Sequence, residues 1–248
     1  MKVSVICVYN NSKQLEEQLL KSLQMQDLDY EFIPIDNSTN RFKSAASALN
    51  YGASISTGDV LVFSHQDIQL KTSDALSKFS NTIYNNPTGN IFGTQGVKEP
   101  SKTYYSNITF GTVFDKTHVN AYSFKLYDVS CVDEGFFGMK KETWQMLNFN
   151  ELLCDNWHLY CVEICLHARK NGGHVYVAPI QLHHYSMGTI SLGYMRNLKL
   201  LCCYYRHDFK YIWTTCYKVK TNAIYINVLY YAWRINRFIK SFYGCSFY

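Results

Sequence analysis

The chain has 248 residues and a formal net charge of +5, and it contains 4 Trp, 21 Tyr and 15 Phe but only 4 Pro. This aromatic-rich, proline-poor composition excludes a disordered or low-complexity protein. The length permits one large domain, or one domain with an appendage.

The charge is not evenly distributed along the chain. From Arg196 to the C-terminus there are nine Lys or Arg residues and one acid, Asp208, whereas the preceding residues include 15 basic and 18 acidic side chains. We therefore expect a nearly neutral body followed by a basic tail.

The N-terminus and the cysteines favour a reduced, cytoplasmic protein. The apolar start of the chain ends at Val8 and is followed by Asn10 and Asn11, so it does not resemble a signal peptide. No apolar run approaches the roughly 20 residues that a membrane-spanning helix needs. The nine cysteines form no CxxC pair and have no spacing typical of a disulfide scaffold.

Strand and helix patterns alternate in the first part of the chain. Runs of β-formers predict the strands, and the spacing of leucines and small residues predicts the helices. Right-handed crossovers place the three strands parallel in one sheet. The predicted elements are a strand over 2–8, a helix with Leu15, Leu19, Leu20 and Leu23 on one face, a strand over 30–35, a helix over 45–54 and a strand over 60–64.

Polar residues follow the second and third of these strands. The second strand ends on Asp36, and the third is followed by the triplet His65-Gln66-Asp67. In open α/β sheets, ligands bind at the carboxyl ends of the strands. A carboxylate fixed there beside an imidazole is suited to a hard cation. The alternative is that the triplet is a solvated loop after a core strand.

Three segments of the chain, taken in order, resemble the nucleotide-binding half of the family 2 glycosyltransferases, which have the GT-A fold. They are KVSVICVYNNSKQLEEQLLKSLQMQ, YEFIPIDNST and LNYGASISTGDVLVFSHQD. In that family a Tyr-Asn pair ends the first strand and an acid that contacts the base ends the second. An Asn-x-Gly segment then precedes the strand that ends in the DXD metal motif. The resemblance implies that the nucleotide is bound by Val8, Tyr9, Asp36, Asn50, Gly52 and His65.

The DXD motif of the family reads His65-Gln66-Asp67 in this chain, a form that resembles one branch of these enzymes. The last acid of the motif is the family's metal ligand, so the resemblance implies Mg²⁺ or Mn²⁺ at Asp67. The chemistry agrees independently. A nucleoside diphosphate is a poor leaving group unless a cation neutralises its charge, and hard oxygen ligands select these two metals.

The middle of the chain has weaker signals. A helix is expected with Leu76, Phe79 and Ile83 on its inner face, followed by a short strand over 90–96. The aromatic and β-branched residues of 100–129 suggest irregular strands on the acceptor side, with no assigned chemistry. For Asp133 and Glu134, in CVDEGFFGMKK, the resemblance implies a place beside the donor sugar; the alternative is a loop with two solvated acids.

A helix is predicted over 155–170, with Asp155 as its N-cap. Within it, Glu163 interrupts the apolar run YCVEICL, and a lone buried acid costs several kcal/mol unless it is paired or faces a cavity. The family's catalytic base lies in a similar segment. The resemblance therefore implies that Glu163 is the base, with Asp155 as the second choice. His158 is expected either to contact the sugar or to pack as a structural histidine.

A last strand is predicted over 174–184. In the family a histidine after this strand completes the metal site, and His184, Ser186 and Gly188 match the H-x-S-x-G pattern found there. Side chains alternate along a strand, so His183 is expected to face away and His184 to be the ligand.

The tail combines apolar, aromatic and basic residues in LKLLCCYYRHDFKYIW and AIYINVLYYAWRINRFIKSFY. Helices of this kind lie in membrane interfaces, with rings at headgroup depth and cations on phosphates. Packing on the domain or forming a homodimer is the alternative. No nucleic-acid-binding motif accompanies the basic residues, so we expect no nucleic-acid partner.

The patterns predict an α/β fold with helices on both faces of the sheet and a basic aromatic helical tail over 191–248, and the resemblance implies a GT-A-like mixed sheet over 1–190. The resemblance also implies a metal-dependent, inverting transfer of a sugar from a nucleoside diphosphate to a hydroxyl of a glycan or lipid-linked acceptor in polysaccharide biosynthesis. The expected location is the cytoplasm, at the inner face of the membrane. A non-catalytic scaffold of the same fold is the alternative, because the DXD motif is altered.

Overall fold

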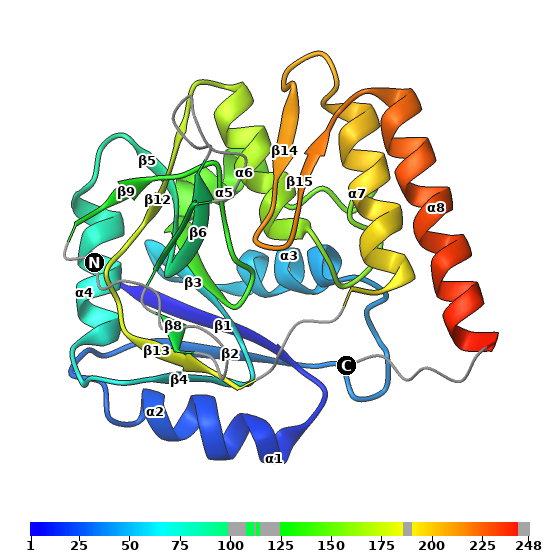
Figure 1. Ribbon diagram of the computed structural model, residues 1–248. Helices are drawn as coiled ribbons and strands as arrows, with labels where there is room; N and C mark the ends of the chain where they lie inside the picture. Colours follow the sequence, from blue (N-terminus) through cyan, green and yellow to red (C-terminus); the bar gives the residue numbers. More distant parts are fainter. Residues whose placement is uncertain (99–107, 112, 115–124, 186–189, 243–248) are drawn as a thin grey trace.

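The structure is a computed structural model that describes residues 1–98, 108–111, 113–114, 125–185 and 190–242. Its centre is a seven-stranded sheet with the order β2-β1-β3-β11-β5-β12-β9 (Figure 1). The strands are β1 (Val3–Tyr9), β2 (Glu31–Asp36), β3 (Val60–His65), β5 (Gly89–Gly93), β9 (Tyr127–Asp128), β11 (Phe136–Lys140) and β12 (His174–Val177).

Strand directions agree with the predicted mixed sheet. β1 is parallel to β2 and β3, and β12 is parallel to β5. Between β3 and β5 lies β11, which is antiparallel to both. The predicted α/β class is confirmed, and the parallel part brings the carboxyl ends of β1, β2 and β3 to one edge.

Helices cover both faces of this sheet (Figure 1). One continuous helical segment follows β1, beginning at the side chain of Asn11, which accepts a hydrogen bond from the backbone N–H of Gln14. The helices are α1 (Ser12–Gln14), the π-helical η1 (Leu15–Leu20), α2 (Lys21–Leu23), α3 (Ala45–Ile55), α4 (Ala75–Asn85), α5 (Lys141–Leu147), α6 (Tyr160–Lys170), α7 (Leu192–Tyr204) and α8 (Ala223–Phe242).

Three smaller sheets complete the described part of the chain. Two of them have three strands, in the orders β10-β6-β7 and β4-β13-β8, and the third is the hairpin β14-β15. Their strands are β4 (Ile68–Leu70), β6 (Gln95–Lys98), β7 (Ile108–Gly111), β8 (Val113–Phe114), β10 (Cys131–Val132), β13 (Leu182–His184), β14 (Tyr211–Trp213) and β15 (Lys218–Lys220).

The alternation of side chains along each strand divides the interior into two hydrophobic clusters. Ile6 and Phe63 point to the cluster that contains α3 and α6, whereas Val5 and Val62 point to the cluster that contains η1 and α4. Both faces of β1 and β3 are therefore buried, as continuous apolar runs require in a sheet covered on both sides.

The predicted boundary at residue 190 does not separate two hydrophobic cores. Tyr194, Leu198 and Tyr205 of the tail are buried in the same cluster as Ile6 of β1. The tail is also not all helical, because the hairpin β14–β15 lies between α7 and α8. The sequence between the two apolar helical patterns did not predict this hairpin, because each of its strands has only three residues, too few to show a strand pattern.

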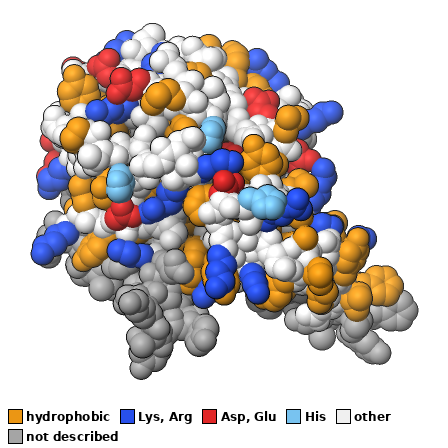
Figure 2. Space-filling model, turned by 90° about the horizontal axis from the view of Figure 1, so that it is seen from above, with side chains coloured by type: hydrophobic (Ala, Val, Ile, Leu, Met, Phe, Trp, Pro, Cys, Tyr) orange, Lys and Arg blue, Asp and Glu red, His pale blue; other side chains and the backbone are white. Residues whose placement is uncertain are grey.

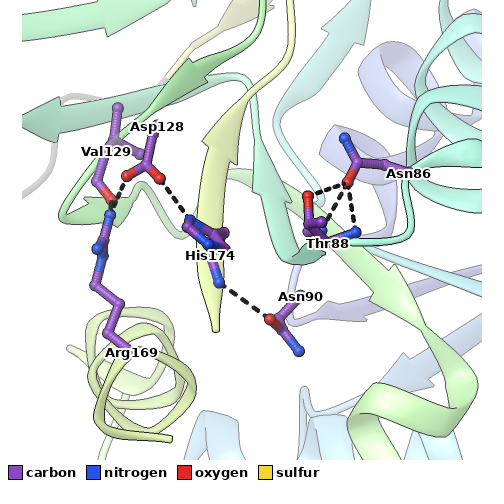
Figure 3. Close-up of polar contacts among 8 residues, drawn as sticks. Asn86, Thr88, Asn90, Asp128, Val129, Arg169 and His174 are labelled. Atoms are coloured by element: carbon purple, nitrogen blue, oxygen red, sulfur yellow. Dashed lines mark hydrogen bonds and ion pairs between the residues drawn. The ribbon is translucent and has the colours of Figure 1, made fainter. Parts of the chain in front are cut away.

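Side-chain hydrogen bonds fix the sheet edge that ends in β9 (Figure 3). Arg169, near the end of α6, donates to the carboxylate of Asp128 and to the carbonyl of Val129. His174 Nδ1 lies 2.8 Å from the other oxygen of Asp128, and the His174 backbone N–H donates to Asn90 Oδ1. These contacts tie α6 to β5, β9 and β12 and so hold the helix whose other end reaches the candidate site.

No helix among the described residues combines the length and the apolar character needed to cross a bilayer.

Candidate active site

A cavity of about 330 Å³ opens at the carboxyl ends of β1 and β3. This volume lies within the range of small-molecule sites. The lining combines apolar side chains with amides, hydroxyls, an imidazole and carboxylates. The lining residues are Val8, Tyr9, Asn10, Asn37, Asn40, Ala45, Leu49, Phe63, Ser64, His65, Gln66, Asp67, Glu134, Phe137, Trp157 and Tyr160.

His65 and Asp67, which line the cavity, form a cluster with His184 in which the ligand atoms all lie within 4.8 Å of one another. Asp67 Oδ1 lies 3.4 Å from His184 Nε2 and 3.9 Å from His65 Nδ1. The structure brings Asp67 and His184 together, and that they hold a cation stays a prediction. His65, expected to contact the nucleotide, also belongs to this cluster.

The pairing of two short strands explains why His184 and not His183 meets Asp67. The predicted strand over 174–184 is in fact two strands, β12 and β13, and β13 pairs antiparallel with β4, directly after Asp67. His184 lies opposite Ile68 in this register, and the Tyr185 N–H donates to the carbonyl of Asp67. His183 instead packs edge-on against Tyr185, with the ring centroids 4.2 Å apart. Ser186 and Gly188 lie outside the described residues.

The electrostatics of the cluster suit a divalent cation. Desolvation and the neighbouring His184 lower the pKa of His65, although Asp67 acts in the opposite direction. A neutral imidazole keeps a lone pair for a metal. His65 Nε2 lies 3.0 Å from the Tyr160 hydroxyl, which orients the ring. The carboxylate of Asp67 suits either Mn²⁺ or Mg²⁺ when diphosphate oxygens and water complete the shell, and the two imidazoles favour Mn²⁺ over the harder Mg²⁺.

Glu134 occupies the wall of the cavity next to this cluster. Its Oε1 atom is buried and has no hydrogen-bond partner among the described residues. Burial and the charge of Asp133 raise the pKa of Glu134 well above its usual value, while the backbone N–H groups that open α6, from Leu159 to Cys161, act to lower it. Leu159 has a positive φ of 64°, a strained conformation that aims these N–H groups at the carboxylate.

Asp133, predicted beside the donor sugar together with Glu134, is instead tied to the protein. Its Oδ1 accepts a hydrogen bond from the Gly135 N–H, and its Oδ2 accepts one from the Thr215 hydroxyl in the β14–β15 turn. A Cβ at Gly135 would lie 3.3 Å from the ring of His184, so the turn passes close to the histidine cluster. Asp133 thus holds the backbone that carries Glu134.

Glu163, the predicted catalytic base, does not line the cavity. Its side chain is fully buried in α6, where Oε1 accepts a 2.8 Å hydrogen bond from the Tyr205 hydroxyl. Burial raises its pKa to about 7, against the lowering effects of Tyr205 and Asn150. Glu163 is therefore a buried acid that is paired with the tail and does not face the cavity.

Replacing Glu163 by Gln is expected to stabilise the protein at alkaline pH. The folded-state pKa lies above the unfolded value of 4.5, so Glu163 contributes its full stability below that value and loses it as the pH rises through about 7. At about pH 8, Glu163→Gln should raise the free energy of unfolding by up to about 3 kcal/mol relative to the wild type. Urea unfolding at acidic and alkaline pH measures this. An equal difference at both pH values would contradict the assignment.

Asp155 and His158 also lie outside the cavity. Helix α6 begins at Tyr160, five residues after the predicted N-cap, and Asp155 pairs with Arg196 of α7 at 2.5 Å. His158 Nε2 lies 2.8 Å from the Ser191 hydroxyl, and desolvation lowers its pKa. Both contacts connect the α5–α6 loop to the start of α7, in agreement with the structural alternative for His158.

Asn50 and Gly52, predicted to bind nucleotide, are also structural in the fold. The Asn50 amide donates to the Phe149 carbonyl and to Glu151, and it accepts from the Trp144 indole and the Phe149 N–H. These four bonds use its hydrogen-bonding capacity. A Cβ at Gly52 would lie 2.6 Å from the side chain of Ile6, so glycine allows α3 to pack closely on β1.

Val8, Tyr9 and His65 line the cavity as predicted for nucleotide-binding residues, whereas Asp36 lies beside it. Asp36 pairs in register with Tyr9 at the ends of β2 and β1, and it accepts a 2.8 Å hydrogen bond from the Ser38 N–H. This bond and the Tyr9 hydroxyl lower the pKa of Asp36, so an exposed carboxylate stands beside the cavity.

Several cavity residues were not assigned a role of their own from the sequence. Gln66 Oε1 accepts from the backbone N–H groups of Asn10 and Asn11, which ties the turn after β3 to the start of α1. Trp157 is 40% exposed although it is a large aromatic side chain. Asn37 was noted only as part of a turn-forming cluster, since asparagine favours turns whether or not it lines a site.

Comparison with known proteins agrees with this fold. The sequence model described as "Glycosyltransferase like family" matches residues 4–211. No curated protein matches the chain significantly by sequence. Solved structures similar in fold include GalNAc-T7 with UDP, GalNAc and Mn²⁺, with 11% identity and a TM-score of 0.60 over 82% of this chain and 48% of that one.

Two other similar structures contain a nucleotide sugar. Staphylococcus aureus TarS with UDP-GlcNAc has 14% identity and a TM-score of 0.53, over 82% of this chain and 66% of that one. The Pyrobaculum calidifontis mannosyltransferase PcManGT with GDP-Man and Mn²⁺ has 16% identity and a TM-score of 0.54, over 84% and 65%. The chain spans about half to two thirds of the length of these structures. It has their GT-A fold and, by the family match over most of its length, belongs to the glycosyltransferase-like family.

Proposed function

We propose that the chain transfers a sugar from a nucleoside diphosphate donor to a hydroxyl group, with inversion at the anomeric carbon and with a divalent cation at His65, Asp67 and His184. The observation that carries the proposal is the convergence of this cluster and the buried, unpartnered oxygen of Glu134 on one cavity. Neither feature is needed to stabilise a parallel sheet, and a buried carboxylate oxygen without a hydrogen-bond partner costs stability when nothing is bound.

Asp67 and His184 would hold the cation, with His65 either as a third ligand or as the group that orients the diphosphate. The bound cation would neutralise the charge that develops on the leaving diphosphate. Tyr160 fixes the His65 ring through its hydroxyl and so limits how the cluster can rearrange when the donor enters.

Glu134 would act as the catalytic base in place of Glu163, with its free oxygen accepting the proton of the acceptor hydroxyl as that hydroxyl attacks. Because a base must be ionised, its raised pKa makes activity increase as the pH rises through that pKa. The N–H groups at the start of α6 support this role, since they stabilise the carboxylate form.

The nucleoside would lie near Tyr9, Asn37 and Asn40, close to the carboxylate of Asp36. These side chains offer hydrogen-bond donors and acceptors next to an aromatic ring, which suits a base and a ribose. UDP-GlcNAc and GDP-Man are the donors bound by two of the similar structures. Trp157, exposed at the cavity, would stack on the apolar face of a sugar ring of the acceptor.

The acceptor would be a glycan or a lipid-linked glycan at the cytoplasmic face of a membrane, in polysaccharide biosynthesis. The basic tail supports this setting, because a positively charged surface favours residence near anionic lipid headgroups.

The test is donor hydrolysis and transfer with a panel of UDP- and GDP-sugars in the presence of Mn²⁺. We expect at least one donor to be turned over, and EDTA to stop turnover completely. Full activity in EDTA would refute the metal role. Tight binding of a nucleoside diphosphate without hydrolysis or transfer of any donor would instead favour the non-catalytic scaffold.

A further inference from the structure

Helix α8 presents a continuous apolar stripe away from the body of the protein. Its inner side chains, Ile226 and Trp233 among them, pack on the hydrophobic cluster that contains α3 and α6. The stripe consists of five large side chains that are each between 53% and 76% exposed: Ile224, Val228, Tyr231, Ile235 and Phe238.

The spacing of the stripe makes it a single surface. Its members follow one another in alternating steps of four and three residues, so at 3.6 residues per turn they fall within about 80° of one another around the helix axis. Figure 2 shows hydrophobic side chains gathered at the edge of the molecule where α8 lies. Elsewhere in the described chain, exposed large hydrophobic side chains are scattered over many elements.

The charge next to the stripe is entirely positive. Arg234 and Arg237 on α8 are exposed, and residues 209–248 contain no acid. Their guanidinium groups lie over the rings of Tyr230 and Trp233, at 5.8 and 5.3 Å from the ring centroids. A helix is about 10 to 12 Å across, and the Debye length is about 8 to 10 Å at physiological ionic strength. The two guanidinium groups are therefore close enough to attract an anionic surface that the stripe contacts.

We propose that the α8 stripe docks on an anionic lipid surface, with the helix lying in the plane of the interface. An apolar stripe with basic residues and no acids on the same helix is the arrangement that such surfaces bind. A second copy of this chain is a poorer occupant, because pairing two stripes would bring two basic helices together without any acid on α8 to compensate.

The geometry excludes a deeper insertion of this helix. α8 is not apolar enough to span a bilayer, and its inner face is already packed against the protein. In Figure 1, β1 runs from the N-terminus towards the side of the molecule on which α7 and α8 lie. Docking through α8 would therefore bring the carboxyl ends of the parallel strands towards the membrane, where a lipid-linked acceptor of the proposed function would be located.

Point substitutions test this surface better than removal of the tail. Deletion from Arg196 onward would remove Leu198, Leu201 and Tyr205 from the hydrophobic cluster that contains α3 and α6, and would unfold the protein. The double variant Ile235→Gln, Phe238→Gln changes only exposed side chains. Its matched control is Met146→Gln, Leu152→Gln, which removes two side chains that are 69% and 89% exposed on another part of the surface.

The measurement is co-sedimentation of the full chain with vesicles of phosphatidylcholine alone or mixed equally with phosphatidylglycerol. We expect the wild type and the control to bind the anionic vesicles, and Ile235→Gln, Phe238→Gln to need at least about tenfold more lipid for half-maximal binding. Arg234→Gln and Arg237→Gln should each weaken anionic binding about fivefold, the factor equivalent to about 1 kcal/mol per basic residue.

Equal binding by the stripe variant and the wild type would overturn the proposal, as would a wild type that does not bind anionic vesicles. A wild type that is dimeric by light scattering and becomes monomeric in the stripe variant, with no lipid binding by either, would assign the stripe to a second copy. Donor hydrolysis is measured on the same samples. A chain that binds vesicles but turns over no donor would count against the proposed catalytic function alone.

Discussion

Glu134→Gln is expected to lower kcat by about 100- to 10,000-fold and to leave the affinity for the nucleoside diphosphate unchanged. Glutamine keeps the shape of the side chain and its contact with the N–H groups at the start of α6, but it cannot accept the proton of the acceptor hydroxyl. Single-turnover transfer measures the chemical step, and calorimetry with the nucleoside diphosphate and Mn²⁺ measures binding.

The matched control for this substitution is Glu163→Gln. Glu163 is the other buried glutamate with a raised pKa, but it lies against Tyr205 outside the cavity. We expect the Glu163 variant to keep turnover within a few fold of the wild type. The reverse result, with turnover lost in Glu163→Gln and retained in Glu134→Gln, would restore Glu163 as the base and would show that α6 rearranges when the donor binds.

Asp67→Ala is expected to abolish Mn²⁺-dependent binding of the nucleoside diphosphate and to lower turnover by about a thousandfold or more. The physical reason is that Asp67 is the carboxylate of the cluster and lies within 3.4 Å of His184 and 3.9 Å of His65. A cation that stabilises the leaving group lowers the activation barrier by several kcal/mol, and each 1.4 kcal/mol is a factor of ten in rate.

Two adjacent histidines supply a sharper comparison for the same site. His184→Ala should weaken Mn²⁺ binding strongly, whereas His183→Ala should leave it unchanged, because the His183 ring packs on Tyr185 instead of facing Asp67. Manganese binding followed by electron paramagnetic resonance, without donor present, measures this directly. Equal Mn²⁺ affinity in the His184 and His183 variants would remove His184 from the metal site.

The strands and helices of the parallel half could be predicted from the sequence because their signals are local. A short apolar run such as Val60–Phe63 indicates a strand that is buried on both faces. Because side chains alternate along a strand, neighbours such as Val5 and Ile6 then belong to different clusters. A polar triplet at the end of such a run must lie at the carboxyl edge. The position of Asp67 at the cavity therefore followed from residues within ten positions of it.

The tertiary structure decided which distant residues join that edge. His184 reaches Asp67 through the pairing of β13 with β4, and Glu134 reaches the cavity through the antiparallel insertion of β11. Glu163 instead bonds to the hydroxyl of Tyr205, the residue that follows α7. Such contacts depend on register and on chain segments far apart in sequence. A buried acid has the same local sequence pattern whether it is a catalytic base or the hydrogen-bond partner of a tyrosine in the tail. Only the packing of the folded chain distinguishes these two roles.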